Sequence, residues 1–255
     1  MNEREPGRAV VIGGSRGIGL AIAKLLGDEG YALVITGRDE TALGAARDEL
    51  TEGGAEVLAV VAADATDEDA AAHLAEEHAP IDVLVVNAGS SSAAPLARTT
   101  LAAWNEQFAT NATGAFLALR AFVPGMVTRG YGRVVVVTST AALSGSPYIS
   151  AYAAAKHAAQ GLVRSVAAEI AGTGVTVNAV CPHFVRTSMT ERTLARIEQA
   201  TGRPADAARA ELESTSRLGR LLEPEEVAAA VRHLVSPGAA AINGTAHVLD
   251  GGGHW

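Results

Sequence analysis

Short runs of apolar residues recur along the chain, separated by stretches of mixed polarity. Each run is too short for an ordinary helix and too uniformly apolar for a strand with one face in water, which is typical of strands buried on both faces. The seven runs are RAVVIGG (8–14), YALVITG (31–37), AEVLAVVA (55–62), IDVLVVNAG (81–89), GRVVVVTS (132–139), VTVNAVC (175–181) and TAHVLDGG (245–252). The stretches between them, such as LAIAKLLGDEG and ETALGAARDELTEGG, have helical spacing and end in glycine. This alternation predicts an α/β fold with a doubly wound parallel sheet of about seven strands and helices on both faces.

One segment interrupts the alternation. Residues from about 187 to 222 are polar and rich in arginine, and TGRP at 201–204 should divide this segment into two helical pieces. The chain shows no short internal repeat, low-complexity linker or shift in composition that would mark a domain boundary. We therefore expect residues 1–255 to form a single domain.

Composition and charge narrow the class of protein. Hydrophobic residues make up 48% of the chain, enough for a large core. The start, MNEREPGR, is charged, and no apolar run approaches the roughly 18 residues of a membrane span, so we expect a cytoplasmic protein. A net charge of −8 argues against general attraction to nucleic acid or to an anionic membrane. Cys181 is the only cysteine, which excludes an internal disulfide and a cysteine-rich metal site, and we expect it to be a small buried hydrophobe.

The first predicted strand leads through GGSRGIG at 13–19 directly into an apolar helix. Glycines at such a turn permit a tight bend and let backbone N–H groups approach a pyrophosphate at the positive end of the helix. Ordinary strand-to-helix turns also use glycine. The position after the first strand of an alternating α/β pattern favours dinucleotide binding.

Over essentially its whole length the sequence resembles the short-chain dehydrogenase/reductase family, which implies a Rossmann-type fold. Several sequence motifs match those of the family, in the same order and at similar spacing along the chain. They are GGSRGIG at 13–19, Asp64 in AADATD, NAG at 87–89, Asn111 in TNATGAF, Ser139 in VVTST, Tyr152 and Lys156 in a YxxxK spacing, and NAVCP followed by Val185 and Thr187.

The resemblance implies a catalytic set of Asn111, Ser139, Tyr152 and Lys156. Residues four apart lie on one helical face, so Tyr152 and Lys156 should point into the same cleft. A neighbouring ammonium and the positive ring of an oxidised nicotinamide favour the phenolate and should lower the pKa of Tyr152 from about 10 toward working pH. By resemblance, Tyr152 gives a proton to the substrate oxygen, Ser139 bonds that oxygen, and Lys156 holds the cofactor ribose. Asn111 would open its helix locally and hold a water that relays protons to Lys156; the alternative is a snorkelling lysine beside a packed tyrosine.

The resemblance also implies which residues bind the cofactor. Asp64 would lie against the adenine, since Asp67 is better placed to cap the following helix, and Thr187 would bond the nicotinamide carboxamide or act as a helix N-cap. The full predicted set is Gly13, Ser15, Arg16, Gly17, Ile18, Gly19, Arg38, Asp64, Ala65, Asn87, Ala88, Gly89, Tyr152, Lys156, Pro182, Val185 and Thr187.

The choice between NADP(H) and NAD(H) depends on charge. NAD sites of this type place an acid at the end of the second strand, whereas NADP sites supply arginine for the additional phosphate. That position is predicted to be Gly37, followed by Arg38, and Arg16 lies in the glycine loop. These residues favour NADP(H). Asp39 would be the acid if the strand ended later, but its place before ETALGAA predicts a helix cap.

Three residues have no usual counterpart in the family. Ile12 stands where threonine is usual, so a hydrogen bond between the first strand and the NAG strand is expected to be missing. His183 replaces the usual glycine after Pro182, which puts an imidazole near the substrate or turned to solvent. His157 matches no family role, and we expect it to be structural. No residue is assigned to a metal.

We expect residues 187 to about 217 to form a small helical lid over the active site. His183 and Met189 are predicted to line the substrate pocket, and the inner surface of the lid would be formed by Met189, Leu194, Ile197 and Leu212. Its arginines, Arg192, Arg196, Arg203 and Arg209, could meet an anionic carrier. The alternative is an amphipathic pair of surface helices with solvated arginines.

The resemblance is greatest to bacterial ketoreductases of polyketide and fatty-acid pathways. It predicts an NADPH-dependent reductase that transfers hydride to a keto group of a bulky or carrier-tethered substrate, and a homotetramer. One alternative is an NAD-linked dehydrogenase that oxidises a secondary alcohol or 3-hydroxyacyl thioester. Another is a non-catalytic regulator that senses the cofactor, although such a protein need not retain the Asn-Ser-Tyr-Lys set.

Overall fold

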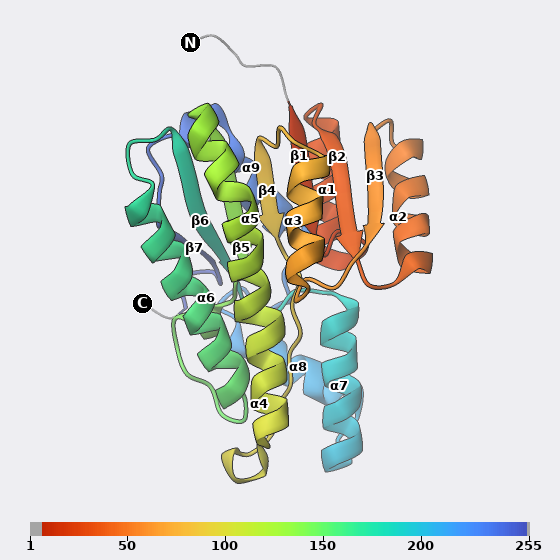
Figure 1. The fold of residues 1–255 in the computed structure, drawn as a ribbon. Coiled ribbons are helices and arrows are strands. Elements are labelled where there is room, and N and C mark those ends of the chain that lie inside the picture. Colours follow the sequence, from red (N-terminus) through yellow and green to blue (C-terminus); the bar gives the residue numbers. More distant parts are fainter. Residues whose placement is uncertain (1–6, 254–255) are drawn as a thin grey trace.

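A seven-stranded parallel sheet forms the centre of the molecule in the computed structural model, which describes residues 7–253 apart from the side chains of residues 200 and 201. Its strand order is β3-β2-β1-β4-β5-β6-β7 (Figure 1). The strands are β1 (Arg8–Ile12), β2 (Ala32–Gly37), β3 (Val57–Ala62), β4 (Val83–Val86), β5 (Gly132–Val137), β6 (Val175–Pro182) and β7 (Ala246–Leu249). All seven predicted strands are confirmed, and the doubly wound α/β fold forms a single domain.

Helices cover both faces of the sheet (Figure 1). They are α1 (Gly17–Asp28), α2 (Glu40–Glu52), α3 (Glu68–Glu77), α4 (Leu101–Phe108), α5 (Gly114–Arg129), α6 (Ser150–Glu169), α7 (Ser188–Thr201), α8 (Ala205–Thr215) and α9 (Pro224–Val235). One core lies between the sheet and α1, α2 and α9, and the other lies between the sheet and α3, α5 and α6. Successive residues of β1 alternate between these cores: Val11 packs into the first and Val10 into the second. Burial on both faces explains why the strands are uniformly apolar.

The chain reverses its direction of winding at β1, which pairs with β2 on one side and with β4 on the other. The carboxyl ends of strands on either side of such a reversal leave a crevice where ligands bind in open α/β sheets. Residues 13–19 follow β1 and residues 87–89 follow β4, so both motifs lie at this edge.

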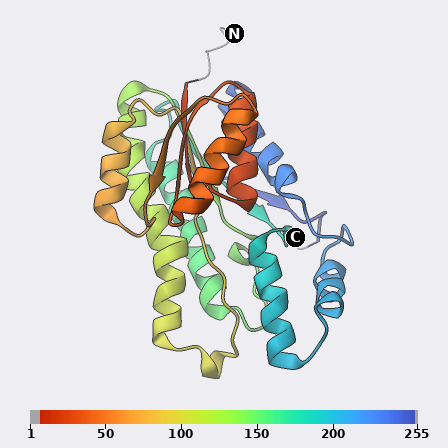
Figure 2. The ribbon, with the colours of Figure 1, turned by 90° about the vertical axis from the view of Figure 1, so that its right-hand side faces the viewer.

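The segment predicted to form two helical pieces does so. Helices α7 and α8 are separated at Gly202, which has φ +71°. Figure 2 shows the two helices, in blue-green and blue, extending beyond the carboxyl edge of the sheet. In the part of the chain that the structure describes, no helix combines the length and apolar character needed to cross a membrane.

Candidate active site

The glycine-rich turn between β1 and α1 allows close backbone approach. Gly13 has φ +80°, which side-chain-bearing residues rarely adopt, and a Cβ there would lie 2.8 Å from the backbone nitrogen of Ala88. A Cβ at Gly19 would overlap the carbonyl oxygen of Gly13. Among the described residues, no side chain caps the first turn of α1 and no acid lies in it, so its N–H groups can receive an anion. This geometry fits the phosphates of a dinucleotide.

Other predicted cofactor residues surround this turn. A Cβ at Gly17 would lie 3.2 Å from Thr187 Cγ2, and one at Gly37 would lie 3.0 Å from Ser15 Oγ. Asn87 Nδ2 donates to the Gly13 carbonyl at 2.8 Å. The end of β2 and the segments that follow β1, β4 and β6 therefore meet at one place.

The remaining predicted cofactor residues lie on the surrounding elements. Ile18 packs against the core from α1, and Ala65 lies next to α5, because its carbonyl oxygen would be 3.1 Å from a Cβ at Gly114. Pro182 is buried at the end of β6. Val185 is 5% exposed, and its carbonyl accepts from Thr190 Oγ1 at 2.6 Å.

The predicted helix caps are confirmed. Asp67 accepts from two backbone N–H groups at the start of α3, and Asp39 accepts from the Ala42 N–H at the start of α2. Thr187 is the N-cap of α7, at 3.5 Å from the Thr190 nitrogen, which agrees with the alternative assigned to it. Asp64 accepts from the backbone and hydroxyl of Thr66, each at 2.9 Å, and its contact with adenine stays a prediction.

Both arginines predicted to read the cofactor phosphate stand near the end of β2. Arg16 Nη2 lies 3.1 Å from Asp39 Oδ2, and both side chains are about half exposed. The backbone N–H of Ala42 and the charge of Arg16 hold the pKa of Asp39 below its usual range. Arg38 is exposed, and its charge helps to lower the pKa of Asp64, after the larger contribution of the hydrogen bonds from Thr66. Asp39 therefore caps a helix and binds Arg16 at the same time.

Lys156 lies deep in the site, where it is 5% exposed. Its Nζ donates to the Val137 carbonyl at the end of β5, at 3.1 Å. A Cβ at Gly89 would lie 3.5 Å from Lys156 Nζ and 2.8 Å from Asn111 Oδ1, so these two side chains converge on Gly89. Burial lowers the pKa of Lys156 to about 8. The ammonium can therefore release and recover a proton near neutral pH.

Asn111 occupies a widened helical turn, residues Ala109–Thr113, between α4 and α5. This confirms the prediction that the helix opens locally at Asn111. The Asn111 side chain is buried, donates to the carbonyls of Ser90 and Gln107 at 2.9 and 3.0 Å, and accepts from the Ser90 N–H at 3.3 Å. These three hydrogen bonds with Ser90 and Gln107 fix the amide beside Lys156.

Sequence reasoning missed two residues that hold Asn111. Gln107 is 1% exposed, and its Nε2 lies 3.2 Å from Ser90 Oγ. A polar residue four positions before Asn111 on the same helix was the available signal for Gln107. Ser90 follows NAG directly, but nothing in its sequence context predicts the contact.

Ser139 and Tyr152 complete the set. Ser139 follows β5, and its Oγ accepts from the Ala141 N–H at 3.1 Å. Burial raises the pKa of the Tyr152 phenol above its usual value, and a hydrogen bond with Ser139 opposes that rise. The direction differs from the lowering expected from Lys156. Burial of the phenol is the larger effect in the protein without cofactor, and Lys156 Nζ, 5.9 Å from the centre of the Tyr152 ring, donates to the Val137 carbonyl.

His183 is half-buried at the end of β6 and does not turn freely to solvent. Its Nδ1 lies 3.2 Å from Thr140 Oγ1, and its Nε2 lies 3.0 Å from Thr215 Oγ1 in α8. Met189 is half-buried on α7. The structure therefore places His183 between the Ser139 loop and the helix pair.

The arginines of the lid are largely engaged with neighbouring groups. Arg203 pairs with Glu211, and Arg209 pairs with Glu191 at 2.9 Å. Arg196 donates to the Ser91 carbonyl at 3.3 Å. These contacts favour the alternative of amphipathic surface helices for the individual arginines. Within the lid, Leu194 is buried, at 1% exposed, as expected for an inner surface.

Residues outside the proposed chemistry have structural surroundings. Cys181 is completely buried, as predicted, with its Sγ 3.0 Å from Thr138 Oγ1. His157 Nδ1 lies 2.9 Å from the Ala153 carbonyl one turn earlier in α6. At Ile12 the main chain links the strands, because the N–H groups of Asn87 and Ala88 donate to the Ile12 carbonyl at 2.9 and 3.0 Å. Within residues 7–253, no group of three His, Cys, Asp or Glu side chains could hold a metal ion.

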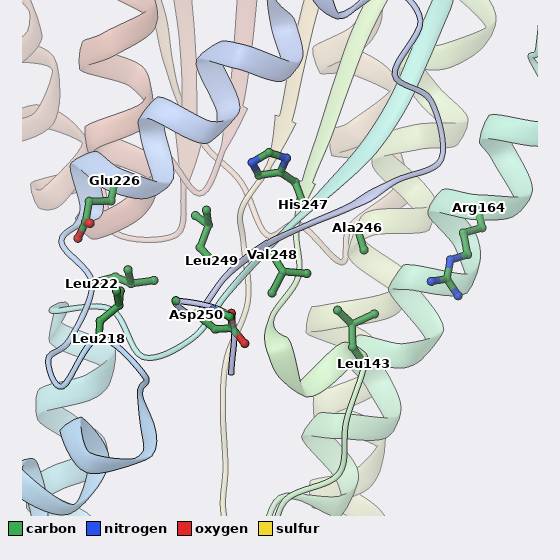
Figure 3. Close-up of a pocket in the computed structure, with 12 residues that line it drawn as sticks. Leu143, Arg164, Leu218, Leu222, Glu226, Ala246, His247, Val248, Leu249 and Asp250 are labelled. Carbon is green, nitrogen blue, oxygen red and sulfur yellow. The ribbon is translucent and has the colours of Figure 1, made fainter. Parts of the chain in front are cut away.

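A pocket of about 770 Å³ lies along β7 (Figure 3). Its walls include Leu143, Arg164, Leu218 and His247. None of the four predicted catalytic residues lines it. The candidate active site is therefore the crevice defined by Gly13, Gly89, Asn111, Tyr152 and Lys156, not this pocket.

Comparisons with known proteins show which family the chain resembles. A family model described as Enoyl-(Acyl carrier protein) reductase matches residues 12–254. Galactitol 2-dehydrogenase (L-tagatose-forming) of Cereibacter sphaeroides is 38% identical over 249 residues, covering 96% of this chain and 93% of that protein. The 3-oxoacyl-(acyl-carrier-protein) reductase of Vibrio cholerae is 36% identical over 244 residues, covering 96% of each chain. A solved structure of an actinorhodin polyketide ketoreductase variant with NADPH has a TM-score of 0.92 and 33% identity, covering 100% of both chains.

These relatives match the chain over nearly its full length, well beyond the glycine turn alone. Their names are those of dehydrogenases and reductases. The chain therefore belongs to the short-chain dehydrogenase/reductase family of oxidoreductases.

Proposed function

We propose that this oxidoreductase is an NADPH-dependent ketoreductase that acts on a bulky or carrier-tethered keto substrate of the polyketide or 3-oxoacyl type. The observation that carries this proposal is the convergence of Asn111 and Lys156 on Gly89, beside a glycine turn suited to phosphate. The names of the ketoreductase and 3-oxoacyl reductase relatives support the substrate class.

The residues of the crevice have distinct roles in this proposal. The N–H groups of the first turn of α1 hold the pyrophosphate, Asp64 and Ala65 lie beside the adenine, and Thr187 holds the carboxamide. Lys156 holds the ribose hydroxyls. When bound, the reduced nicotinamide supplies the hydride that reaches the carbonyl carbon.

Tyr152 donates the proton to the substrate oxygen in this proposal. In the structure, burial raises the pKa of this phenol, so it is fully protonated at neutral pH and can act as a donor. Ser139 orients the substrate oxygen toward it. Lys156, with a pKa of about 8, restores the proton to the phenol with the help of Asn111. The set thus contains a proton donor, Tyr152, and a group that can return a proton to it near neutral pH, Lys156.

Cofactor preference gives the first prediction. Changing Arg38 to glutamine should weaken NADPH binding about tenfold while NADH binding changes little, because a charge-assisted contact to the additional phosphate is lost. Arg38 is the better target because Arg16 is already paired with Asp39. Titration of both cofactors against wild type and R38Q measures the difference. Equal losses for the two cofactors, or a wild type that prefers NADH, would show that Asp39 reads the ribose.

An NAD-linked dehydrogenase is the second candidate. Asp39 supports it, since its carboxylate is about half exposed at the end of β2 and could accept from ribose hydroxyls if Arg16 moved. The similarity to galactitol 2-dehydrogenase points in the same direction. Incubating the protein with NAD⁺ and a panel of secondary alcohols and 3-hydroxyacyl thioesters, beside NADPH and the matching ketones, separates the two. Faster turnover in the ketone arm supports the proposal, and faster turnover in the alcohol arm supports the dehydrogenase.

The homotetramer expected from the family stays a prediction. Light scattering on the purified protein measures its mass directly against the 25.9 kDa of one chain.

A further inference from the structure

His183 connects two parts of the molecule that are distant in sequence. Thr140, which contacts His183 Nδ1 at 3.2 Å, directly follows Ser139. Thr215, which contacts His183 Nε2 at 3.0 Å, is the last residue of α8. One imidazole ring therefore spans the gap between the loop of a predicted catalytic residue and the second helix of the lid.

The hydrogen bonds around His183 have a defined direction. Thr215 Oγ1 donates its single proton to the Leu212 carbonyl at 2.7 Å, so toward His183 it can only accept. Nε2 of His183 must then carry a proton, and in the neutral ring Nδ1 is the acceptor for the Thr140 hydroxyl. The result is a continuous hydrogen-bond chain from Thr140 through His183 and Thr215 to Leu212.

This hydrogen-bond chain connects α8 to the sheet. Helix α8 is joined to α7 by Arg209, which pairs with Glu191 at 2.9 Å. Helix α7 is in turn joined to the segment that follows β6 by Thr190, whose hydroxyl donates to the Val185 carbonyl. Thr215 gives α8 a direct link to the end of β6, next to the loop of Ser139.

We propose that His183 is a positioning residue that fixes the distance between α8 and the Ser139 loop, and thereby selects the substrate by size. This inference rests on the proposed function only for its consequence in catalysis. While these hydrogen bonds are intact, α8 is held close to the reactive groups and small keto substrates are well positioned. When the hydrogen bond between His183 and Thr215 is lost, α8 can move outward, which favours bulkier ketones over small ones.

Hydrogen exchange of the α8 backbone amides tests the link without any substrate. Thr215→Val removes the acceptor with little change in shape. We expect the exchange rate in α8 to rise roughly two- to fivefold, because one hydrogen bond at an exposed residue such as Thr215 adds only a small amount to the stability of the helix. Thr215→Ser keeps the hydroxyl and should exchange as wild type does. Thr193→Val is the matched control, because within residues 7–253 the Thr193 hydroxyl donates to the Met189 carbonyl of its own helix, α7, and makes no bond to another element.

The double variant His183→Leu with Thr215→Val decides whether the two residues act as one unit. If they do, the double variant exchanges no faster than either single variant. Additive increases, an unchanged Thr215→Val protein, or an equal effect of Thr193→Val would overturn the link. An unchanged unfolding temperature for each variant would show that the fold is retained and that only α8 opens.

The consequence for catalysis is measured separately. For a small and a bulky keto thioester, the ratio of kcat/KM should shift toward the bulky substrate in Thr215→Val and return in Thr215→Ser, with an unchanged Kd for NADPH. Faster exchange in α8 without this shift would overturn the role in selection and leave the link intact. A wild type that reduces neither thioester contradicts the proposed function, whereas the exchange result stands independently of it.

Discussion

Replacing Tyr152 with phenylalanine is expected to lower kcat for ketone reduction by about 10²- to 10⁴-fold while NADPH binds almost as before. The hydroxyl is the proposed proton donor, whereas the ring packs beside Lys156 in either case. Steady-state rates at saturating NADPH, with a separate titration of cofactor binding, give the two quantities. A general acid is the group whose loss reduces the rate of the chemical step without loss of binding.

The same substitution at Tyr131 is the matched control. Tyr131 precedes β5 at the opposite, amino edge of the sheet, where its ring lies 4.7 Å from the Arg133 guanidinium carbon. Tyr131→Phe should therefore leave turnover close to wild type. Substantial ketone reduction by Tyr152→Phe at saturating NADPH would remove Tyr152 from the mechanism.

Replacing Lys156 with methionine should slow reduction strongly and yet stabilise the cofactor-free protein. Folding buries the ammonium and lowers its pKa to about 8, so at pH 7 a charge is held where water solvates it poorly. An apolar side chain of similar length removes that cost but leaves the Val137 carbonyl without its donor. The net gain should be about 2 kcal/mol in the free energy of unfolding at pH 7.

The effect of Lys156 on stability must depend on pH in one direction. Between a pKa of about 8 in the folded state and its ordinary value of 10.5, the unfolded chain keeps a proton that the folded protein has lost. Wild-type stability should therefore gain from Lys156 as pH rises through this window, and its deficit relative to Lys156→Met should shrink. Urea unfolding of both proteins from pH 7 to pH 10 measures the deficit. Lys24→Met, which changes a half-exposed lysine paired with Glu49, serves as the control. If the deficit of wild type relative to Lys156→Met stayed constant over this pH range, it would contradict the lowered pKa of Lys156.

The positions of the strands and motifs followed from local patterns. Strands buried on both faces leave uniformly apolar runs, so even β6, with Asn178 inside it, was predictable from the sequence. The caps Asp39 and Asp67 were predictable because a helix begins directly after each of them. The widened turn at Asn111 was expected from the family resemblance, not from spacing.

Contacts between distant segments were not predictable. Asp39 binds Arg16 across 23 positions, and His183 binds Thr140 and Thr215 across 43 and 32 positions. No local pattern marks such pairs, because they depend on how loops at the sheet edge meet. The direction of the Tyr152 pKa shift in the cofactor-free protein was not predictable for the same kind of reason: burial raises this pKa, the hydrogen bond with Ser139 opposes the rise, and the four-residue spacing shows neither.

Transfer of deuterium from labelled NADPH to a ketone tests the central proposal most directly. Purified protein is incubated with NADPH deuterated at the transferable position of the nicotinamide and with a panel of 3-oxoacyl thioesters and cyclic ketones, and the products are examined by NMR. We expect an alcohol carrying one deuterium on the former carbonyl carbon with the wild-type protein, and almost none with Tyr152→Phe. NADPH that binds but transfers no label to any member of the panel would contradict it and would point to a protein that senses the cofactor.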